Sequence, residues 1–475
     1  MKRAWFPLFA AAAAFLAFAP SLRNGFVSWD DHMTLVYNLA YRDLGWENLR
    51  WMFSTFLLGH YQPLSWLSFW LDHRLWGVAP AGYHLTNLLL HAANTAQVYG
   101  LALLLLGKRP GLRWGALFAA LLFGLHPLRA ESVVWATERR DVLSACFLLA
   151  ATRCYLQAQR LPQRRPSFMN LAAVLYLLSL LSKVVGITWP GALLLLDAYP
   201  LGRFSREPRK LLTLLTEKWA FIVLSLAAAF IGMTAQGSGT ALVPYSQYGA
   251  GARFGQAAYQ SGFYLWKTLW PFGLSPLYEK SFLLEPSAFW CFGGAAAMVT
   301  AALLLLRRRW PAGLAAWALY GLMLIPALGI VKSGRQIAAD RFTYLPCLGL
   351  ALLAGAGVQR LWENGPAAAR RTLLAGSCVL FMGLGALSWR QAAFWHDSVS
   401  LWSRVVDVDP RSYFGRQNLA AALTAEGRHA EAAEEQARAK RARADVFEQA
   451  GRKLLDRGED ARAEEYLKKA RGTQP

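Results

Sequence analysis

Residues 84–106, HLTNLLLHAANTAQVYGLALLLL, contain no aspartate, glutamate, lysine or arginine. A helix needs roughly 20 apolar residues to cross the hydrocarbon core of a membrane, so this segment is long enough to span it. Further apolar segments of similar composition occur at residues 4–20, 114–126, 141–157, 168–183, 184–199, 219–235, 287–306, 311–330, 343–361 and 371–388. The sequence therefore predicts an all-α, polytopic membrane protein with about eleven transmembrane helices.

The composition agrees with a membrane protein. Hydrophobic residues make up 55% of the 475 residues and charged residues 17%, whereas an average soluble protein has about 25% charged residues. The formal net charge is +21, but most of the excess lies in short loops between apolar segments, as the positive-inside rule predicts. We therefore expect no nucleic-acid partner. The five cysteines form no CxxC motif and predict neither a disulfide framework nor a metal site.

The loops alternate in charge along the chain. Lysine and arginine collect at one set of loops, which we expect in the cytoplasm: 2–3, 108–113, 160–165, 203–218, 307–309 and 370–371. The opposite, external side then receives residues 21–83, 127–140, 236–286, 331–342 and everything after 388. Residues 4–20 predict an uncleaved first helix rather than a signal peptide, because Pro20 would follow the cleavage site. The N-terminus is then cytoplasmic and the C-terminal tail external.

The tail at residues 389–475 is polar and helical in its periodicity. Two helix–turn–helix patterns are centred on Gly427 and Gly458, 31 residues apart, which is close to the 34-residue period of tetratricopeptide repeats. Residues 1–388 thus form the membrane domain, and 389–475 form a tetratricopeptide-like tail that we expect to bind a protein partner or dock on the membrane domain. An unrelated helical hairpin is the alternative.

An acidic pair stands in the first external loop, at residues 25–32, GFVSWDDH. One carboxylate of Asp30 and Asp31 can accept a proton from a hydroxyl, while the other orients that group or helps to hold a divalent cation. His32 follows directly and is a candidate to support the loop or the acceptor. The structural alternative is that Ser28 or Asp30 only caps a following helix.

Ionisable residues are also dense in the second external loop, at residues 126–141, HPLRAESVVWATERRD. Charges this close to the membrane need partners, because a lone charge at that depth is costly. Pairing of Glu138 with Arg139 or Arg140 is the structural alternative, and a cluster that faces an anionic ligand is the functional one. Glu131 is a candidate to position an acceptor or, with Asp31, to hold a metal.

Positive charge on the external side runs against the positive-inside trend. Lys183 lies in an external turn, and the last loop of the membrane domain carries Lys332, Arg335 and the pair Asp340-Arg341. A phosphate is the natural ligand for such residues, since a guanidinium binds it with two parallel hydrogen bonds. An Asp340–Arg341 ion pair that closes the loop is the alternative. No Walker loop, GxGxxG, GxSxG or HExxH motif is present, which argues against a nucleotide-driven pump, an α/β-hydrolase or a zincin.

Together these stretches carry a resemblance that runs over nearly the whole chain. The matching segments are residues 25–31, 61–68, 83–91, 126–141, 181–183, 195–201, 334–336 and 339–346. In their order and spacing, the chain resembles the bacterial relatives of the transmembrane and tetratricopeptide-repeat-containing O-mannosyltransferases, which belong to the GT-C glycosyltransferase superfamily. Gln62 and Arg129 depart from this pattern, because we expect histidines at both positions, and the tail is shorter than the repeat arrays of the animal proteins.

The resemblance implies a GT-C membrane fold in the bacterial inner membrane and transfer of a sugar from a polyprenyl-phosphate donor on the periplasmic face. Asp30 and Asp31 match the catalytic acidic pair of the family.

We expect an inverting transfer in which one of these aspartates is the base, and Arg341, Arg139 and Lys183 bind the donor phosphate. Candidate supporting residues are His32, His126 and Asp340. The acceptor is a protein or glycan hydroxyl, the sugar is mannose in the family, and the need for a divalent metal is open. The alternatives are a non-catalytic membrane scaffold and a lipid or glycan transporter.

Overall fold

The computed structural model describes residues 5–205, 207–238, 243, 245, 249–279, 286–330, 336–456 and 458–472, with the backbone alone at 286–288. Lys332, Arg335 and parts of the expected loops 236–286 and 331–342 lie outside these residues. In the described part of the chain, helices dominate and the two strands β1 (Tyr278–Glu279) and β2 (Gln336–Ala338) form one antiparallel ladder. The predicted all-α class is confirmed.

Each expected apolar segment contains a helix. The helices are α1 (Trp5–Ala17), α4 (Pro80–Leu105), α5 (Leu112–Gly124), α7 (Arg139–Arg160), α8 (Arg165–Ser182), α9 (Trp189–Ala198), α11 (Trp219–Ser238), α13 (Pro286–Leu305), α14 (Pro311–Leu324), α15 (Leu348–Asn364) and α16 (Ala367–Ala393).

Among the described residues, four helices are long and apolar enough to cross a membrane, or up to five if α5 and the segment Pro127–Val134, bent by 53°, form one span. The protein is an integral membrane protein, and the number eleven stays a prediction.

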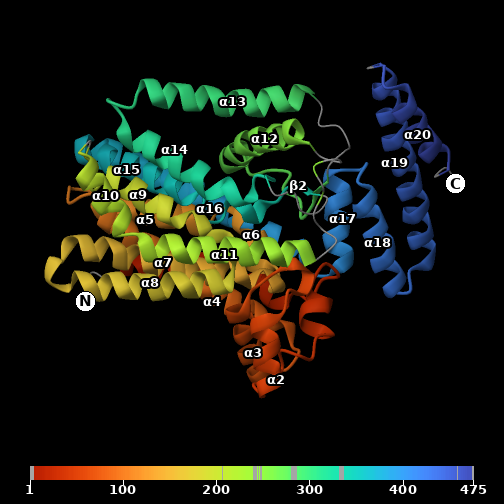
Figure 1. The fold of residues 1–475 in the computed structure, drawn as a ribbon, viewed down its shortest axis with the longest axis horizontal. Coiled ribbons are helices and arrows are strands. Elements are labelled where there is room, and N and C mark those ends of the chain that lie inside the picture. The colour runs from red at the N-terminus through yellow and green to blue at the C-terminus, as the bar shows by residue number, and fades with distance from the viewer. Residues whose placement is uncertain are drawn as a thin grey trace.

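The remaining elements lie mostly at the two ends of this bundle (Figure 1). At one end, the tail end, lie α2 (Trp46–Ser54), α3 (Pro63–Trp76), α6 (Ala130–Val134) and the tail helices α17 (Ser398–Val408), α18 (Tyr413–Ala425), α19 (His429–Leu455) and α20 (Asp460–Arg471). At the opposite end lies α10 (Pro208–Thr216). The helix α12 (Ala250–Leu269) packs against α13. The Ser28 amide donates to the Ser398 hydroxyl at 2.8 Å, so the acidic-pair loop and the tail share one end of the molecule.

The first two expected external loops contain short helices and differ in how far they are buried. Residues 127–140 form a chain of short helices, η4 (Pro127–Arg129), α6 and η5 (Ala136–Glu138), and every residue of this segment is buried. Ion pairs and backbone hydrogen bonds compensate for the burial, as the next subsection describes. In the first loop, Trp66 is fully buried, while Trp46 is 75% exposed.

Four buried polar residues form a stripe along one face of α4. His84, Asn87, His91 and Asn94 recur every three or four residues and are all buried, whereas Leu89 on the opposite face is 55% exposed. This spacing places them on one helix face, which turns polar groups toward the protein and apolar ones toward lipid. The stripe is therefore an interior hydrogen-bonding surface.

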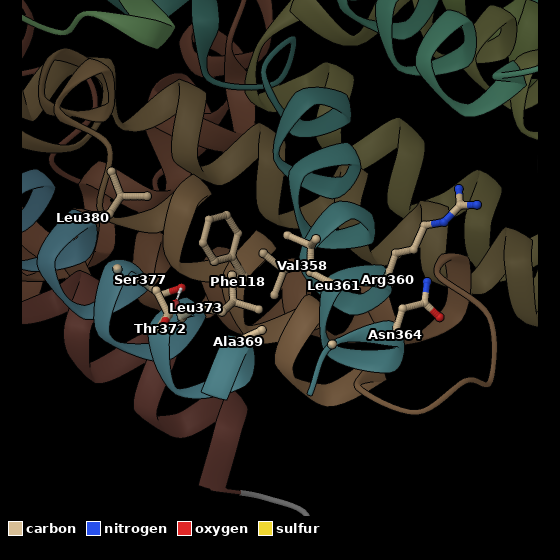
Figure 2. A pocket seen from close by; sticks show the side chains of 12 residues that line it. Phe118, Val358, Arg360, Leu361, Asn364, Ala369, Thr372, Leu373, Ser377 and Leu380 are labelled. Carbon is tan, nitrogen blue, oxygen red and sulfur yellow. Dashed lines mark hydrogen bonds between the residues drawn. The ribbon is translucent and has the colours of Figure 1, made fainter. Parts of the chain in front are cut away.

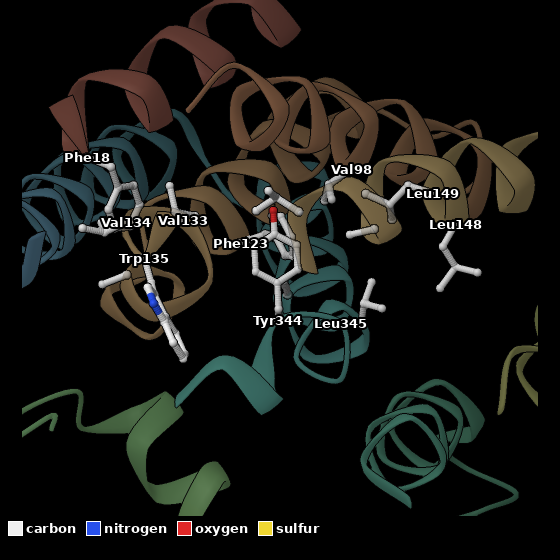
Figure 3. Close-up of a cluster of buried hydrophobic side chains, with 14 of the residues drawn as sticks. Phe18, Val98, Phe123, Val133, Val134, Trp135, Leu148, Leu149, Tyr344 and Leu345 are labelled. Atoms are coloured by element: carbon white, nitrogen blue, oxygen red, sulfur yellow. The ribbon is translucent and has the colours of Figure 1, made fainter. Parts of the chain in front are cut away.

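His91, one member of the stripe, holds Tyr344 by a hydrogen bond. The His91 Nε2 atom lies 3.0 Å from the Gly124 carbonyl oxygen, which only accepts, so Nε2 donates. Nδ1 must then accept from the Tyr344 hydroxyl at 2.8 Å, and that hydroxyl accepts from Asn94 at 3.0 Å. Tyr344 lies in the main hydrophobic core beside Phe123 (Figure 3).

The tail has both expected glycine turns. Gly427 and Gly458 adopt φ of +77° and +72°, a conformation that glycine takes without strain, and each joins two helices. However, α19 runs without a break over 27 residues, because residues 436–446 contain no glycine or proline. From α18 onward, the described tail is thus a three-helix arrangement of α18, α19 and α20 rather than two separate helix pairs.

Candidate functional site

The two aspartates of the acidic pair have different environments. The Asp31 carboxylate accepts hydrogen bonds from the Val27 amide and the Thr137 amide, both at 3.0 Å, and from the Thr137 hydroxyl, and its side chain is buried. Burial raises the pKa of Asp31 to about 6, although these hydrogen bonds oppose the rise. Asp31 therefore ties its loop to the 127–140 segment.

The Asp30 carboxylate is half-buried and makes no hydrogen bond or ion pair with the described residues. Burial raises its pKa above the ordinary value, the Arg140 charge lowers it in part, and Glu138 adds to the rise. A carboxylate that is partly enclosed, has a raised pKa and keeps its acceptor positions open has the properties of a general base. Neither Ser28 nor Asp30 caps the following turn with its side chain.

Glu138 is the centre of a charged cluster beside the acidic pair. Its Oε2 atom accepts from Arg140 Nη2 at 2.7 Å and Nε at 3.0 Å, and its Oε1 atom pairs with Lys183. Lys183 Nζ also lies 2.7 Å from Asp141 Oδ1. Arg140, Lys183 and Arg341 together hold the pKa of Glu138 well below its usual range against the effect of burial. The Lys183 side chain is 18% exposed and thus within reach of a ligand.

Arg341 joins this cluster from another part of the chain. It lies in η9 (Asp340–Thr343), and both its backbone amide, at 2.8 Å, and its Nη1 atom bond the Glu131 carboxylate. The Nε and Nη2 groups of Arg341 make no hydrogen bond in the described part of the chain. The Asp340–Arg341 pair that was the alternative is absent among the described contacts, where Asp340 accepts instead from the Tyr278 hydroxyl at 3.0 Å.

Arg139 does not belong to the cluster. All three of its guanidinium nitrogens are engaged: Nε with Asn87 at 2.8 Å, Nη2 with the Tyr83 carbonyl at 2.7 Å, and Nη1 with Asp72. The side chain is fully buried, so the expectation that Arg139 binds the donor phosphate is not supported. Arg140, one residue later on α7, faces the cluster instead.

The predicted histidines support the loops. His126 accepts from the Leu128 amide at 3.3 Å and donates to the Thr268 carbonyl at 2.9 Å, which joins the 127–140 segment to α12. His32 stacks on Tyr37 with ring centroids 5.9 Å apart.

His60, which no sequence pattern indicated, is a half-buried side chain near Arg140, Lys183 and Arg341. Burial, reinforced by these cations, keeps its pKa well below the usual value. Leu58, two residues earlier, has φ +54°, and such strain in a non-glycine residue often marks a functional loop.

The residues present do not fit a resident metal at the predicted pair. The Asp31 oxygens are taken by Val27 and Thr137, and those of Glu131 by Arg341. Within the described ranges, no group of three or more histidine, cysteine or acidic residues is placed to hold an ion.

Two apolar cavities lie away from this cluster. A groove of about 920 Å³ between α5, α15 and α16 is lined by side chains such as Phe118, Leu361 and Leu373 (Figure 2). A second of about 680 Å³ lies between α1, α5 and α16. Their mainly apolar walls suit lipid chains, and they contain none of the charged groups described above.

Comparisons with known proteins agree with the resemblance. No protein-family model matches the chain. The chain is 26% identical, over 89% of its length, to "Protein O-mannosyl-transferase Tmtc1" of Drosophila melanogaster, and it covers 60% of that protein. It is 27% identical over 63% of its length to "Protein O-mannosyl-transferase TMTC3" of Mus musculus, covering 36% of it. It thus spans less than two thirds of these relatives.

Among solved structures, the crystal structure of ArnT from Cupriavidus metallidurans bound to undecaprenyl phosphate aligns over 96% of this chain and 81% of that one, with a TM-score of 0.40 and 16% identity. The sequence matches confirm the predicted resemblance: the chain is a relative of the O-mannosyl-transferases of the TMTC group.

Proposed function

We propose that this protein is an inverting membrane glycosyltransferase of the GT-C type that moves a sugar, mannose in the first instance, from a polyprenyl-phosphate donor to an acceptor hydroxyl. The site faces the periplasm of a bacterial inner membrane in this proposal. Two observations support it: the similarity to proteins named O-mannosyl-transferases, and an open carboxylate beside a cluster of cations at one end of a membrane domain.

Asp30 is the general base in this mechanism. The acceptor oxygen attacks C1 of the sugar, its proton moves to the Asp30 carboxylate, and the bond between C1 and the phosphate oxygen breaks. The departing lipid phosphate takes the electron pair of that bond. Asp31 positions Asp30, because its carboxylate is already bonded to Val27 and Thr137.

The phosphate is bound by Arg341, Lys183 and Arg140. These cations face the carboxylates of Asp30, Glu131, Glu138 and Asp141, so the cluster has little net charge before a donor arrives. A phosphate competes with Glu131 for Arg341 and with Asp141 for Lys183, and the free Nε and Nη2 groups of Arg341 offer two parallel donors. As charge develops on the leaving phosphate, these donors stabilise it.

The open Asp30 carboxylate carries the proposal, and a reconstituted assay tests it. Purified protein in liposomes is supplied with polyprenyl-phosphate mannose and a serine- or threonine-containing peptide, a glycolipid or a glycan in separate reactions, and products are identified by mass spectrometry. Transfer by the wild type and its loss in Asp30→Asn support the proposal. A scaffold or a transporter would show no transfer to any acceptor, and full activity in both Asp30→Asn and Asp31→Asn would remove the acidic pair from the mechanism.

A further inference from the structure

The first part of the tail is packed against the loop that carries the acidic pair. The Gly25 amide donates to the His396 carbonyl at 2.8 Å, and the Ser28 amide donates to the Ser398 hydroxyl at 2.8 Å. The indole of Trp402 donates to the Ser28 hydroxyl at 3.3 Å and stacks on Trp29, with ring centroids 5.0 Å apart. Trp29, the residue before Asp30, therefore has one face against the tail.

Trp29 also contacts the 127–140 segment. Its ring lies 5.4 Å from that of Trp135, and Trp135 stacks in turn on Trp395 at 5.7 Å. The acidic-pair loop is thus enclosed between the membrane domain, through Trp135 and Thr137, and the tail, through Ser398 and Trp402. A tail that served only to bind partners would not need these contacts.

The same stretch of tail also reaches the segment that carries Arg341. Ser412, which is 1% exposed, donates to the Glu279 carboxylate at 2.6 Å, and that carboxylate also accepts from the Phe414 amide at 3.1 Å. Glu279 belongs to β1, which pairs with β2 two residues before Asp340. Tyr278, its neighbour on β1, donates to Asp340, the residue beside Arg341.

The connection between the two contact points is stiff. Leu401, Trp402 and Val405 of α17 are buried, and Trp402 meets Phe414 at the start of α18 edge to face, with ring centroids 5.8 Å apart. We call residues 396–414 the tail bridge. Side chains that are packed on both sides transmit displacements instead of absorbing them, because close-packed interiors deform little.

We propose that the tail bridge sets the position of Asp30 relative to Arg341, so that the beginning of the tail is part of the transfer site. This inference rests on the proposed function, because it assumes that Asp30 and Arg341 act on one donor–acceptor pair. Trp402 and Ser412 are positioning residues: Trp402 acts through Trp29 on Asp30, and Ser412 acts through Glu279 and β2 on Arg341.

The two ends of the bridge should give different kinetic results. Trp402→Ala displaces the base, so kcat should fall roughly ten- to a hundred-fold, the size expected for a misplacement of about 1 Å, at an unchanged KM for the donor. Trp402→Phe keeps an aromatic face against Trp29 and should recover most of kcat. Ser412→Ala loosens the Arg341 side and should raise the donor KM several-fold, whereas Ser412→Thr keeps the hydroxyl and should restore it.

Matched controls are available in the same chain. Ser403→Ala removes a hydroxyl from α17 that makes no hydrogen bond among the described contacts, and Trp219→Ala removes an indole that is 66% exposed at the start of α11. Both should leave kcat and KM unchanged. If Trp402→Ala fails to fold, Ser398→Ala, which changes little volume, replaces it: a lowered kcat supports the bridge, and wild-type kcat contradicts it.

Amide hydrogen exchange tests the bridge without any transfer reaction. Trp402→Ala should speed exchange in residues 25–34, and Ser412→Ala should speed it in residues 336–343, each in folded, monodisperse protein. Absence of sugar transfer by the wild type would refute the proposed function while these exchange results still report on the bridge. Unchanged exchange together with wild-type kcat and KM in Trp402→Ala and Ser412→Ala would overturn the bridge while leaving the proposed function in place.

Discussion

Replacing each aspartate by asparagine separates a catalytic carboxylate from a structural one. Asp30→Asn removes a proton acceptor that bonds no described residue, so the fold should be unaffected within about 0.5 kcal/mol. Transfer should fall about 10²- to 10⁴-fold, the usual contribution of general acid–base catalysis. Asp43→Asn, at an exposed position in the same loop region, is the matched control and should retain full activity.

In Asp31→Asn, two effects on the stability of the fold should oppose each other. The pKa of Asp31 is raised from 3.8 to about 6, so its ionised form is disfavoured in the fold by about 3 kcal/mol at neutral pH, and asparagine relieves this cost. In the variant, however, the side-chain NH2 group of the asparagine faces the Val27 N–H, which donates to the carboxylate in the wild type. An unsatisfied buried donor costs about 1–3 kcal/mol. Stability at pH 7 should therefore change little.

The pH dependence of stability distinguishes Asp31→Asn from Asp30→Asn. A raised pKa means that the folded state binds the proton more tightly, so the Asp31 contribution to stability falls as pH rises from about 3.8 to 6 and is constant above that. Asp31→Asn should flatten this part of the unfolding profile, measured by melting purified protein in detergent between pH 4 and 7, whereas Asp30→Asn should act mainly on transfer. Loss of transfer in Asp31→Asn with full activity in Asp30→Asn would refute this division of roles.

Further predictions follow from the same contacts. Arg341→Ala leaves Glu131 buried and unpaired, which should cost about 3–5 kcal/mol of stability. When Glu131→Gln is already present, Arg341→Ala should cost less stability but should still weaken apparent donor affinity about ten- to a hundred-fold. Unchanged donor affinity in the folded double variant would remove Arg341 from the site. Because burial raises the pKa of Asp30, the acid limb of kcat/KM should lie above pH 3.8, and a limb at or below the ordinary aspartate value would argue against an enclosed base. In a background without exposed native cysteines, Arg164→Cys should resist a membrane-impermeant thiol reagent in intact cells and Asp445→Cys should react; equal labelling would contradict the predicted topology.

Much of the architecture was evident in the sequence. The helices of the membrane domain follow from uninterrupted apolar segments, because a backbone in lipid must satisfy its own hydrogen bonds. The glycine turns at Gly427 and Gly458 were also predicted correctly, since a helix end in the left-handed conformation favours glycine. Both features depend on local sequence alone.

The candidate site was only partly evident in the sequence. Clustering of acidic and basic residues in loops indicated Asp30, Glu131, Lys183 and Arg341, which the structure brings to one end of the bundle. It did not distinguish Arg139 from Arg140, because a helix turns by about 100° per residue and adjacent side chains point in different directions. His60 lay in no recognised pattern. The strain at Leu58 that marks its loop becomes visible only in the backbone angles.

The sequence by itself thus determined the kind of protein: a helical membrane domain, an acidic pair at its loops and a helical tail. Only the tertiary structure decided which carboxylate is locked and which is open, because that depends on Val27 and Thr137 reaching Asp31 from two separate segments. Likewise, the packing of Trp402 against Trp29 joins residues far apart in the chain. Local periodicity and charge pattern specify elements, whereas hydrogen bonds and ring contacts between distant segments depend on the folded arrangement of all of them.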